Sequence, residues 1–295
     1  MPSYPFETVD VFTHQRFGGN PLAVFTDARG LSTALMQQIA AEMNLSETAF
    51  VLPPDDPACD ARVRIFNRTA EMPFAGHPSI GTAWVLARLR GLTGDRLRLE
   101  LPAGIVEAVL ARKPDGMPTG ARIAAPQSLT TGATLDPAAI AACIGVPVAA
   151  IRVDRHLPTE ISVGVTFVAA ELTPSAIAAA IPDIARFRDT RATMPGDGDR
   201  LSLIVYVRDG NRLHARMFAP LAGTYEDPAT GSANAALAAL LLSLDGGDSA
   251  SFTTRQGIEM GRPSTLHVEA VRTPAGITAT VAGDCVAMFS GRFDV

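Results

Sequence analysis

One eight-residue pattern occurs twice in this chain, as GHPSIGTA at residues 76–83 and as EDPATGSA at residues 226–233. Both copies contain Pro-x-x-Gly followed by Thr or Ser and then Ala. His77 of the first copy stands where the second copy has Asp227, so each copy has a different polar residue directly before the shared proline. Such an echo suggests a duplicated unit of roughly 130 residues, a common domain size, so the flanking sequence should repeat as well.

The sequence around the two copies does repeat. Each copy follows a segment of alternating apolar and polar residues, typical of a half-buried strand, and leads into an apolar helical pattern and then another strand pattern. These segments are 61–67, 80–92 and 95–104 around the first copy, and 213–219, 233–244 and 251–261 around the second. The second helix is apolar on nearly every face, as in a helix enclosed by strands. The sequence therefore predicts a duplicated α+β fold, with strands wrapped around one central helix per domain.

Other segments complete the predicted organisation. Residues 199–218 read as a hairpin with the Asp-Gly pair 209–210 as its turn. Helices are predicted at 135–145 and 172–181, each with a proline near its first turn. The residues 113–134, rich in Pro, Gly and Thr, are predicted to connect the two domains.

The composition argues against several classes of function. The chain has 295 residues and a formal net charge of −5, which disfavours nucleic acid or an anionic membrane as the main partner. Lys113 is the only lysine, and its turn-like surroundings suit neither a pyridoxal phosphate site nor a P-loop. No G-x-G-x-x-G dinucleotide loop occurs. Ser79 is one place too late for a G-x-S-x-G nucleophile elbow.

The cysteines and histidines form no pattern typical of a disulfide framework or a metal site. Cys59, Cys143 and Cys285 are odd in number and far apart, and the histidines lack ligand spacing. The sequence has neither a leader-like N-terminus nor an apolar run of the ~18 residues that a membrane span needs. We therefore expect a soluble, cytoplasmic protein that needs no metal or organic cofactor.

The two copies of the pattern place polar groups at predicted helix starts. Proline is favoured in the first turn and keeps the preceding residue out of the helix, so the helices are expected to begin at Pro78 and Pro228. Asp227 then lies at an N-cap, either as a plain cap or as part of a site. His77 is a poor capping residue, so capping does not account for it. Helix N-termini suit a carboxylate ligand, and pseudo-twofold packing of the domains would turn both ends toward one cleft.

Five longer stretches resemble the PhzF-like family, named for the isomerase of phenazine biosynthesis. They are DVFTHQRFGGNPLAVF (10–25), NLSETAFV (44–51), RIFNRTAEMPFAGHPSIGTA (64–83), FAPLAGTYEDPATGSA (218–233) and QGIEMGRPS (256–264). The resemblance implies the diaminopimelate epimerase-like fold, in which two similar domains each form a strand barrel around a helix, with the active site between them. It also implies that the last strand returns to the first domain. The expected domains are residues 1–118 with 278–295, and residues 128–277.

The resemblance also assigns roles to particular residues. Epimerases and racemases of this fold have a cysteine at each helix start, whereas this chain has His77 and Asp227 there, which disfavours racemisation by two thiols. The family pattern puts the acid/base on the Glu of Ser-Glu-Thr, here Glu47, which from the sequence alone reads as the solvated end of a strand. The implied reaction moves a proton between carbons of trans-2,3-dihydro-3-hydroxyanthranilate, with the ring hydroxyl and amino groups held by the histidine and the aspartate. The other implied substrate-binding residues are Gly76, Gly231, Ser232 and Asn20.

Two alternatives to this function stay open. Glu47 could serve an epimerase or isomerase of another amino-acid-like carbon acid, or the fold could be a small-molecule binding protein without turnover. By resemblance we also expect a homodimer whose ligand is a small carboxylate, with neither nucleic acid nor membrane as partner. Many relatives have Thr-Pro where this chain has Asn67 and Arg68, so the rim of the pocket is expected to differ.

Overall fold

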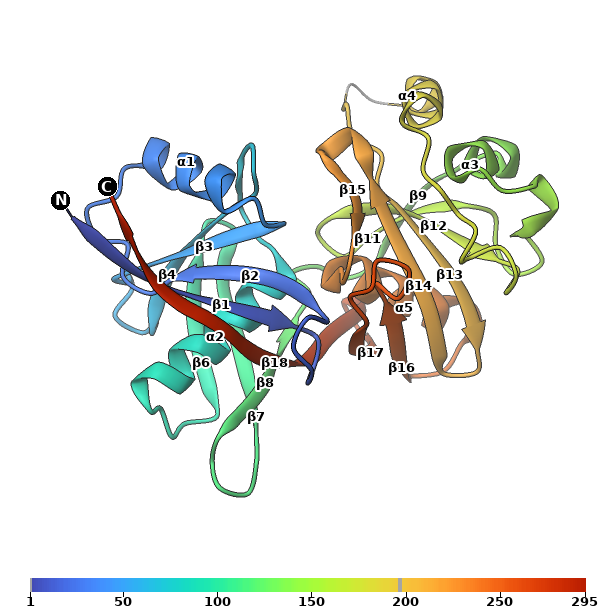
Figure 1. Ribbon diagram of the computed structural model, residues 1–295. Coiled ribbons are helices and arrows are strands. Elements are labelled where there is room, and N and C mark those ends of the chain that lie inside the picture. Colours follow the sequence, from blue (N-terminus) through green and yellow to red (C-terminus); the bar gives the residue numbers. More distant parts are fainter. Residues whose placement is uncertain (1, 196–197) are drawn as a thin grey trace. The chain divides into compact units, whose positions relative to one another are not determined.

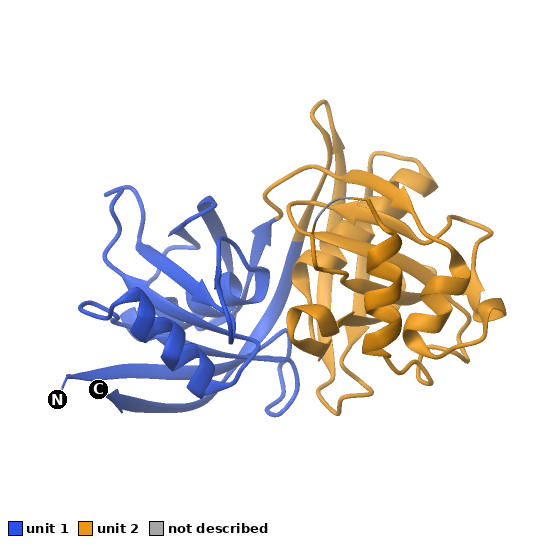
Figure 2. Cartoon of the chain, turned by 90° about the horizontal axis from the view of Figure 1, so that it is seen from above, with its two compact units in different colours: residues 1–124, 281–295 blue, residues 125–280 orange. Residues whose placement is uncertain are grey.

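The computed structural model describes residues 2–195 and 198–295, and the chain forms two compact units. Unit 1 comprises residues 1–124 and 281–295, and unit 2 comprises residues 125–280 (Figure 2). The last strand, β18 (Gly276–Asp294), begins in unit 2 and ends in unit 1, where it pairs antiparallel to β1 (Ser3–Val11). Unit 1 is therefore built from both ends of the chain.

Unit 1 is an α+β unit. Its helices are α1 (Thr33–Met43) and α2 (Gly76–Arg90). Its strands are β1, β2 (Asn20–Phe25), β3 (Glu47–Leu52), β4 (Ala61–Phe66), β5 (Glu71–Met72), β6 (Arg96–Leu101), β7 (Gly104–Arg112), β8 (Pro118–Ala124) and the end of β18.

Helix α2 is enclosed by the strands of unit 1. It contacts β1, β2, β3, β6, β7 and β8, and every residue from Gly76 to Ala87 is buried (Figure 1). At Gly81, the glycine that both copies of the pattern share, an added Cβ would lie 2.6 Å from Leu22 Cδ2 and 2.8 Å from Val11 Cγ2. Protein interiors leave no room for such an overlap, so glycine permits the close approach of helix and strands here.

Unit 2 is also an α+β unit. Its helices are α3 (Pro137–Ile144), α4 (Ile184–Thr193) and α5 (Gly231–Asp245), with the short 3₁₀ turns η1 (Val148–Ala150) and η2 (Pro220–Ala222). Its strands are β9 (Thr130–Thr134), β10 (Ile151–Arg152), β11 (Thr159–Ser162), β12 (Thr166–Leu172), β13 (Leu203–Asp209), β14 (Arg212–Ala219), β15 (Thr224–Asp227), β16 (Ser249–Gln256), β17 (Ser264–Thr273) and the start of β18.

The strands of the two units pair in the same order. In unit 1, β2 is parallel to β3, β3 is antiparallel to β4, and β4 is antiparallel to β5 and parallel to β6. In unit 2, the pairs β12–β13, β13–β14, β14–β15 and β14–β16 have the same directions in the same order. The central helix follows β5 in unit 1 and β15 in unit 2. The repeated sequence thus corresponds to a repeated arrangement of strands and helix.

Helix α5 is the central helix of unit 2. It contacts β11, β12, β16 and β17, and every residue from Ala233 to Leu242 is buried. This confirms the prediction that the all-apolar helix is enclosed. A separate cluster of buried side chains in unit 2 includes residues of α3, α4, β12 and β13, so this unit has apolar packing outside its central helix too.

The segment 172–181 is not the helix that its sequence predicts. It forms consecutive turns after β12, because several of its amides donate to carbonyls only three residues earlier. The carbonyls of Ile177 and Ala180 instead accept hydrogen bonds from the buried guanidinium of Arg216, both at 2.8 Å. A partner from a distant strand therefore overrides the local helix propensity.

Other local expectations differ in detail from the structure. The helix expected at 135–145 is present as α3. The 199–218 hairpin is present, but its turn is 210–211, because Asp209 already pairs with Arg212. The boundary between the two units falls after residue 124, inside the predicted connection 113–134. This segment also includes β8, which pairs with β7 and β18, and β9, which pairs with β11. In the part of the chain that the structure describes, no helix is both long and apolar enough to cross a membrane.

Candidate active site

The two central helices begin at different places in the repeated pattern, which corrects the expectation that both begin at the proline. Helix α2 begins at Gly76, two residues before Pro78, whereas α5 begins at Gly231, three residues after Pro228. Pro78 is tolerated because the first amides of a helix have no partner within it. His77, expected outside the helix, accordingly lies inside its first turn.

Asp227 is not the N-cap of α5. It is the last residue of β15 and pairs with Met217 of β14. Thr230 occupies the N-cap position, and its hydroxyl donates to Asp227 Oδ2 at 2.5 Å. The Asp227 carboxylate therefore accepts a hydrogen bond from the N-cap residue of the helix. The extended backbone of β15 sets the position of Asp227.

The predicted site residues fall into two groups. Asn20, Glu47, Gly76 and His77 lie in unit 1, whereas Asp227, Gly231 and Ser232 lie in unit 2. Within unit 1, the structure brings Glu47 and His77 together. Within unit 2, the predicted residues stand at the end of β15 and in the first turn of α5. Gly231 and Ser232 are the first helical residues, so their amides are among those without a partner inside the helix.

The unit 1 group is assembled by a parallel strand pair. Asn20 begins β2 and Glu47 begins β3, and because these strands are parallel, both starts lie at the same edge, with Leu22 opposite Glu47. His77 Nε2 lies 3.3 Å from Glu47 Oε2. The His77 side chain is 6% exposed and that of Glu47 is 17% exposed, so the pair is largely shielded while the carboxyl group keeps some access to solvent.

His77 is held in its neutral form. Burial lowers the pKa of His77 from 6.5 to about 3, against a smaller opposing effect of a hydrogen bond with the backbone of Pro21. Proline has no amide hydrogen, so its carbonyl must be the acceptor and the ring the donor. Nε2 makes no hydrogen bond with the described residues, which assigns the donating proton to Nδ1. A neutral ring of this tautomer presents its Nε2 lone pair toward Glu47.

This tautomer decides what the pair can do with a proton. A lone pair on Nε2 can accept a hydrogen bond from a protonated carboxyl group, but it offers no hydrogen to a carboxylate. One proton can therefore lie between the two side chains, bound to Glu47 Oε2 and hydrogen-bonded to His77 Nε2. A carboxyl group that takes up a proton from a substrate would find an acceptor already in place, which is an arrangement suited to general acid–base chemistry.

The low pKa of His77 predicts a pH-dependent stability. The unfolded chain binds a proton at His77 below about pH 6.5, whereas the folded protein does not until about pH 3, so stability falls as the pH drops through this window. Between pH 7.5 and 5, the free energy of unfolding should fall by about 2 kcal/mol more in the wild type than in His77→Asn. Denaturant titrations at several pH values measure this difference. His267→Asn, at an exposed position, is the control for the substitution itself, and an equal slope in the wild type and His77→Asn would contradict the assignment.

The loop that precedes Asn20 is fixed by residues that the sequence did not single out. Asp10 is 2% exposed, and its Oδ2 accepts a hydrogen bond from the Phe17 amide at 2.9 Å. Gly19 has a φ of 65°, and an added Cβ would lie 2.3 Å from the carbonyl oxygen of Val11. The second glycine of the Gly-Gly-Asn sequence is thus required by the backbone, which turns there into β2. The sign of this in the sequence was Asp10, an acidic residue between two valines of a predicted strand.

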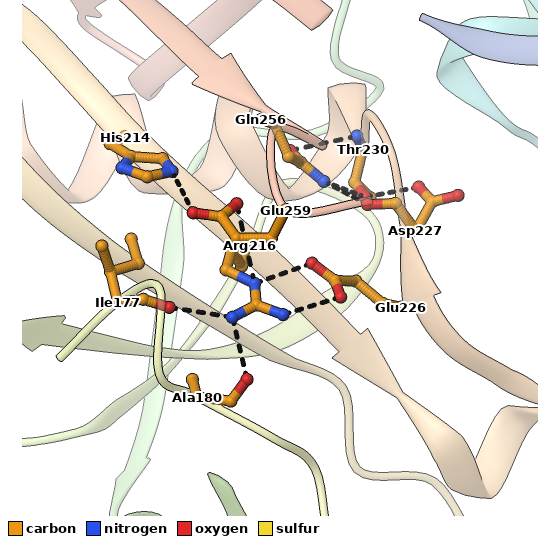
Figure 3. A network of polar contacts seen from close by, with 9 residues as sticks. All are labelled: Ile177, Ala180, His214, Arg216, Glu226, Asp227, Thr230, Gln256 and Glu259. Atoms are coloured by element: carbon orange, nitrogen blue, oxygen red, sulfur yellow. Dashed lines mark hydrogen bonds and ion pairs between the residues drawn. The ribbon is translucent and has the colours of Figure 1, made fainter. Parts of the chain in front are cut away.

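A chain of amide and hydroxyl side chains ends at Asp227, and Figure 3 shows two of its members, Gln256 and Thr230. Gln256 Nε2 donates to the carbonyl oxygen of Asp227 at 2.8 Å and to Thr230 Oγ1 at 3.1 Å. Asn234 Nδ2 donates to Gln256 Oε1 at 2.8 Å and to the carbonyl oxygen of Thr230 at 2.9 Å. Gln256 and Asn234 are fully buried. The end of β15 is therefore tied to β16 and α5 through these side chains.

A buried ion pair lies next to this chain (Figure 3). Arg216 Nε and Nη2 donate to Glu226 Oε1 and Oε2, both at 2.8 Å, and the side chains of this pair are 7% and 10% exposed. Glu259 Oε2 lies 3.9 Å from Arg216 Nε, and its other oxygen is 3.0 Å from His214 Nε2. Glu226 directly precedes Asp227, so the ion pair fixes the strand from which Asp227 projects. This ion pair was not predicted, although an arginine within a buried strand pattern was a sign of it.

Asn67, one of the two residues where relatives often differ, builds a turn. Its Oδ1 accepts hydrogen bonds from the amides of Thr69 at 2.8 Å and Ala70 at 2.7 Å. Its backbone carbonyl accepts from Gln37 Nε2 at 2.9 Å. This Asx turn connects β4 to β5 without the Thr-Pro found in many relatives. Asn67 thus shapes the chain between β4 and β5.

Metal-binding clusters and the single lysine bear on whether the site could hold a cofactor. The described residues include no cluster of three or more His, Cys, Asp or Glu side chains that could hold a metal ion. Lys113 is exposed in the turn between β7 and β8, where its amide donates to Met117 and its carbonyl accepts from Gly116. The cysteines Cys59, Cys143 and Cys285 are all buried and free.

The chain is similar to known proteins over nearly its whole length. The family described as phenazine biosynthesis-like protein (PhzC-PhzF) matches residues 9–291. An uncharacterized isomerase of Mesorhizobium japonicum is 38% identical over 96% of this chain and 96% of that protein. The trans-2,3-dihydro-3-hydroxyanthranilate isomerase of Pseudomonas aeruginosa is 36% identical over 97% of this chain and 98% of that protein.

A solved structure has the same fold. The phenazine biosynthesis protein of the PhzF family from Bacillus anthracis matches with a TM-score of 0.88 and covers 100% of both chains. Its sequence is 24% identical, so this likeness concerns the fold.

Proposed function

Because the chain belongs to the phenazine biosynthesis-like family and is an isomerase, we propose that it moves a proton between two carbons of a small cyclic carboxylate by means of Glu47. The observation that carries this proposal is the carboxyl group of Glu47 beside a neutral, buried His77. The substrate that we propose is trans-2,3-dihydro-3-hydroxyanthranilate, because a relative that matches nearly the whole chain is named for this reaction.

In this reaction Glu47 begins as a carboxylate and takes a proton from one ring carbon. The electron pair of the broken C–H bond shifts the ring double bonds, and the protonated carboxyl group then returns its proton to another carbon on the same face. The atoms of substrate and product are the same, as an isomerisation requires. His77 Nε2 can accept a hydrogen bond from Glu47 while the carboxyl group holds the proton, which keeps the acid in one orientation between the two transfers.

The remaining predicted residues bind the substrate in this proposal. His77 and Asp227 hold the ring hydroxyl and amino groups, and the amides of Gly76 and Gly231 with the Ser232 hydroxyl bind the substrate carboxylate. The single lone pair of His77 Nε2 accepts from the ring donor while Glu47 is a carboxylate, and from Glu47 only while that carboxyl group holds the proton. Amides at a helix start suit an anion because they have no partner within the helix. Asn20, at the start of β2, shapes the same pocket. These roles follow from the diaminopimelate epimerase-like fold that the resemblance implies. The repeated order of strand pairs supports that duplicated fold.

The direct test is turnover of the proposed substrate. Protein dialysed against a chelator should convert trans-2,3-dihydro-3-hydroxyanthranilate in deuterated buffer, with the shift of the double bonds followed by proton NMR. Loss of activity that a metal restores would contradict a cofactor-independent reaction. Exchange of deuterium without a double-bond shift would favour an epimerase, and binding without exchange would favour a binding protein.

The roles assigned to His77 and Asp227 predict a loss of binding in their amide variants. Both His77→Asn and Asp227→Asn should weaken substrate binding roughly 10- to 100-fold, because each leaves a polar group of the substrate without its matched partner. Calorimetric titration with 3-hydroxyanthranilate, a stable aromatic analogue, measures this effect. Asp209→Asn in the β13–β14 hairpin is a matched control and should bind as the wild type does. Unchanged affinity in either site variant would remove that residue from the binding role.

A further inference from the structure

The carboxylate of Asp227 is the last acceptor in a chain of directed hydrogen bonds (Figure 3). The chain runs from Asn234 to Gln256, from Gln256 to Thr230, and from Thr230 to Asp227 Oδ2, with distances of 2.8, 3.1 and 2.5 Å. Three of these residues, Asn234, Gln256 and Asp227, are at most 7% exposed. Asn234 Nδ2 faces two acceptors, Gln256 Oε1 and the Thr230 carbonyl oxygen, which defines the direction of the first bond. Asn234 Oδ1 has no hydrogen-bond partner among the described residues.

The direction of this chain follows from the backbone groups at its centre. Gln256 Nε2 faces the carbonyl oxygen of Asp227, which can only accept, and Gln256 Oε1 faces the amide of Thr230, which can only donate. These two contacts distinguish the nitrogen of the Gln256 side-chain amide from its oxygen. The second hydrogen of Nε2 then points to Thr230 Oγ1, which must accept it. The single hydroxyl hydrogen of Thr230 is left for Asp227 Oδ2.

We propose that Thr230 and Gln256 are positioning residues that keep Asp227 a hydrogen-bond acceptor, so that the site selects ligands carrying an amine or hydroxyl donor. A carboxylate that already accepts the Thr230 hydroxyl is stabilised in its charged form, and a charged carboxylate has no hydrogen to donate. A ligand that presents a carbonyl or carboxylate oxygen to Asp227 is therefore rejected. This inference rests on the proposed role of Asp227 in binding the substrate.

The first test measures the carbon-13 NMR signal of the Asp227 carboxyl group in the absence of ligand. Protein labelled with carbon-13 at the aspartate side-chain carboxyl gives one signal that is absent from Asp227→Asn, which assigns it to Asp227. Thr230→Val removes the hydroxyl and should move this signal, while Thr230→Ser, which restores the hydroxyl, should return it to the wild-type position. Thr254→Val is the control for the same substitution, because the Thr254 hydroxyl is buried and makes no hydrogen bond with the described residues. An Asp227 signal unchanged in Thr230→Val would overturn the inference.

The second test measures ligand selection with two probes, 3-hydroxyanthranilate, which carries amine and hydroxyl donors, and benzoate, which carries neither. Thr230→Val should bind 3-hydroxyanthranilate roughly 10- to 100-fold more weakly, the range expected for hydrogen bonds to a charged group, and benzoate as the wild type does. Thr230→Ser should restore selection. Equal weakening for both probes would show a merely structural role and overturn the inference.

The two tests separate failure of this inference from failure of the proposed function. If Asp227→Asn keeps the wild-type preference for 3-hydroxyanthranilate, Asp227 does not bind the ligand and its proposed role is wrong, whatever the carboxyl signal shows. If Asp227→Asn loses the preference but Thr230→Val keeps both the preference and the signal, the binding role stands and the positioning role of Thr230 is wrong. Thermal unfolding of each variant confirms that the protein compared is folded.

Discussion

Glu47→Gln is expected to lower kcat by ~10⁴-fold or more while substrate binding stays within about threefold of the wild type. General acid–base catalysis by one positioned group is typically worth ~10²–10⁴-fold, and here one carboxyl group is assigned both proton transfers. The loss should therefore lie at the upper end of this range. Glutamine cannot take up a proton at working pH, so the reaction fails at its first step.

The surroundings of Glu47 explain why binding should survive this substitution. His77 Nε2 presents a lone pair 3.3 Å from Glu47 Oε2. The amide of a glutamine can donate a hydrogen to that lone pair, as the protonated carboxyl group would, so Glu47→Gln imitates the acid form of the enzyme. Glu47→Asp keeps the carboxyl group but moves it by one methylene, and it should lose activity because proton transfer depends on close placement.

Single-turnover kinetics and calorimetric titration of the same protein samples separate the two effects. Glu42→Gln, on an exposed position of α1, is the matched control and should have wild-type kcat and affinity. If Glu47→Gln retains a tenth or more of the wild-type rate, the base lies elsewhere, and His77 and Asp227 become the first residues to test.

The central helices were the part of the fold that the sequence predicted best. An all-apolar helix cannot face water, so the segment at 233–244 had to be enclosed, and α5 is. The alternation at 61–67 and 213–219 likewise gave β4 and β14. These patterns are local and strong, because burial of a whole helix or of one strand face leaves a periodic trace in the chain.

The helix starts could not be predicted, because they depend on partners distant in sequence. The two copies of the pattern are nearly alike, yet α2 begins at Gly76 and α5 only at Gly231. In unit 2, Gln256 bonds to the backbone of Asp227 and Thr230 and holds the residues between them outside the helix. Gln256 lies on another strand, and the pattern at 226–233 contains no sign of it.

The candidate site was predicted unevenly for a similar reason. The repeated pattern itself drew attention to His77 and Asp227, since each is a polar residue directly before the shared proline. Glu47 came only from the family resemblance, because the start of a strand is an ordinary place for a glutamate. The neutral state of His77 needed the structure, since it depends on burial and on the carbonyl of Pro21, which is far from it in sequence.

Arg216→Met is expected to lower the free energy of unfolding by about 3–5 kcal/mol, the cost of leaving one member of a buried ion pair without its partner. Glu226 would keep its charge in a position that is 10% exposed, with the Glu259 carboxylate nearby. The carbonyls of Ile177 and Ala180 would lose their donor as well. Their segment forms turns in place of the helix that its sequence predicts, so this loss should loosen it.

Two further variants separate the charge of the Arg216 side chain from its shape, and a third is a control. The double variant Arg216→Met with Glu226→Gln removes the stranded charge, so it should recover a large part of the loss, as replacement of both members of buried ion pairs often does. Arg216→Lys keeps the charge but cannot form the two parallel hydrogen bonds to Glu226, so its stability should be intermediate. Arg188→Met, at an exposed position of α4, is the control and should be close to the wild type. Denaturant unfolding measures all four proteins. Wild-type stability in Arg216→Met would mean that the ion pair makes no net contribution to stability and does not fix the strand that carries Asp227.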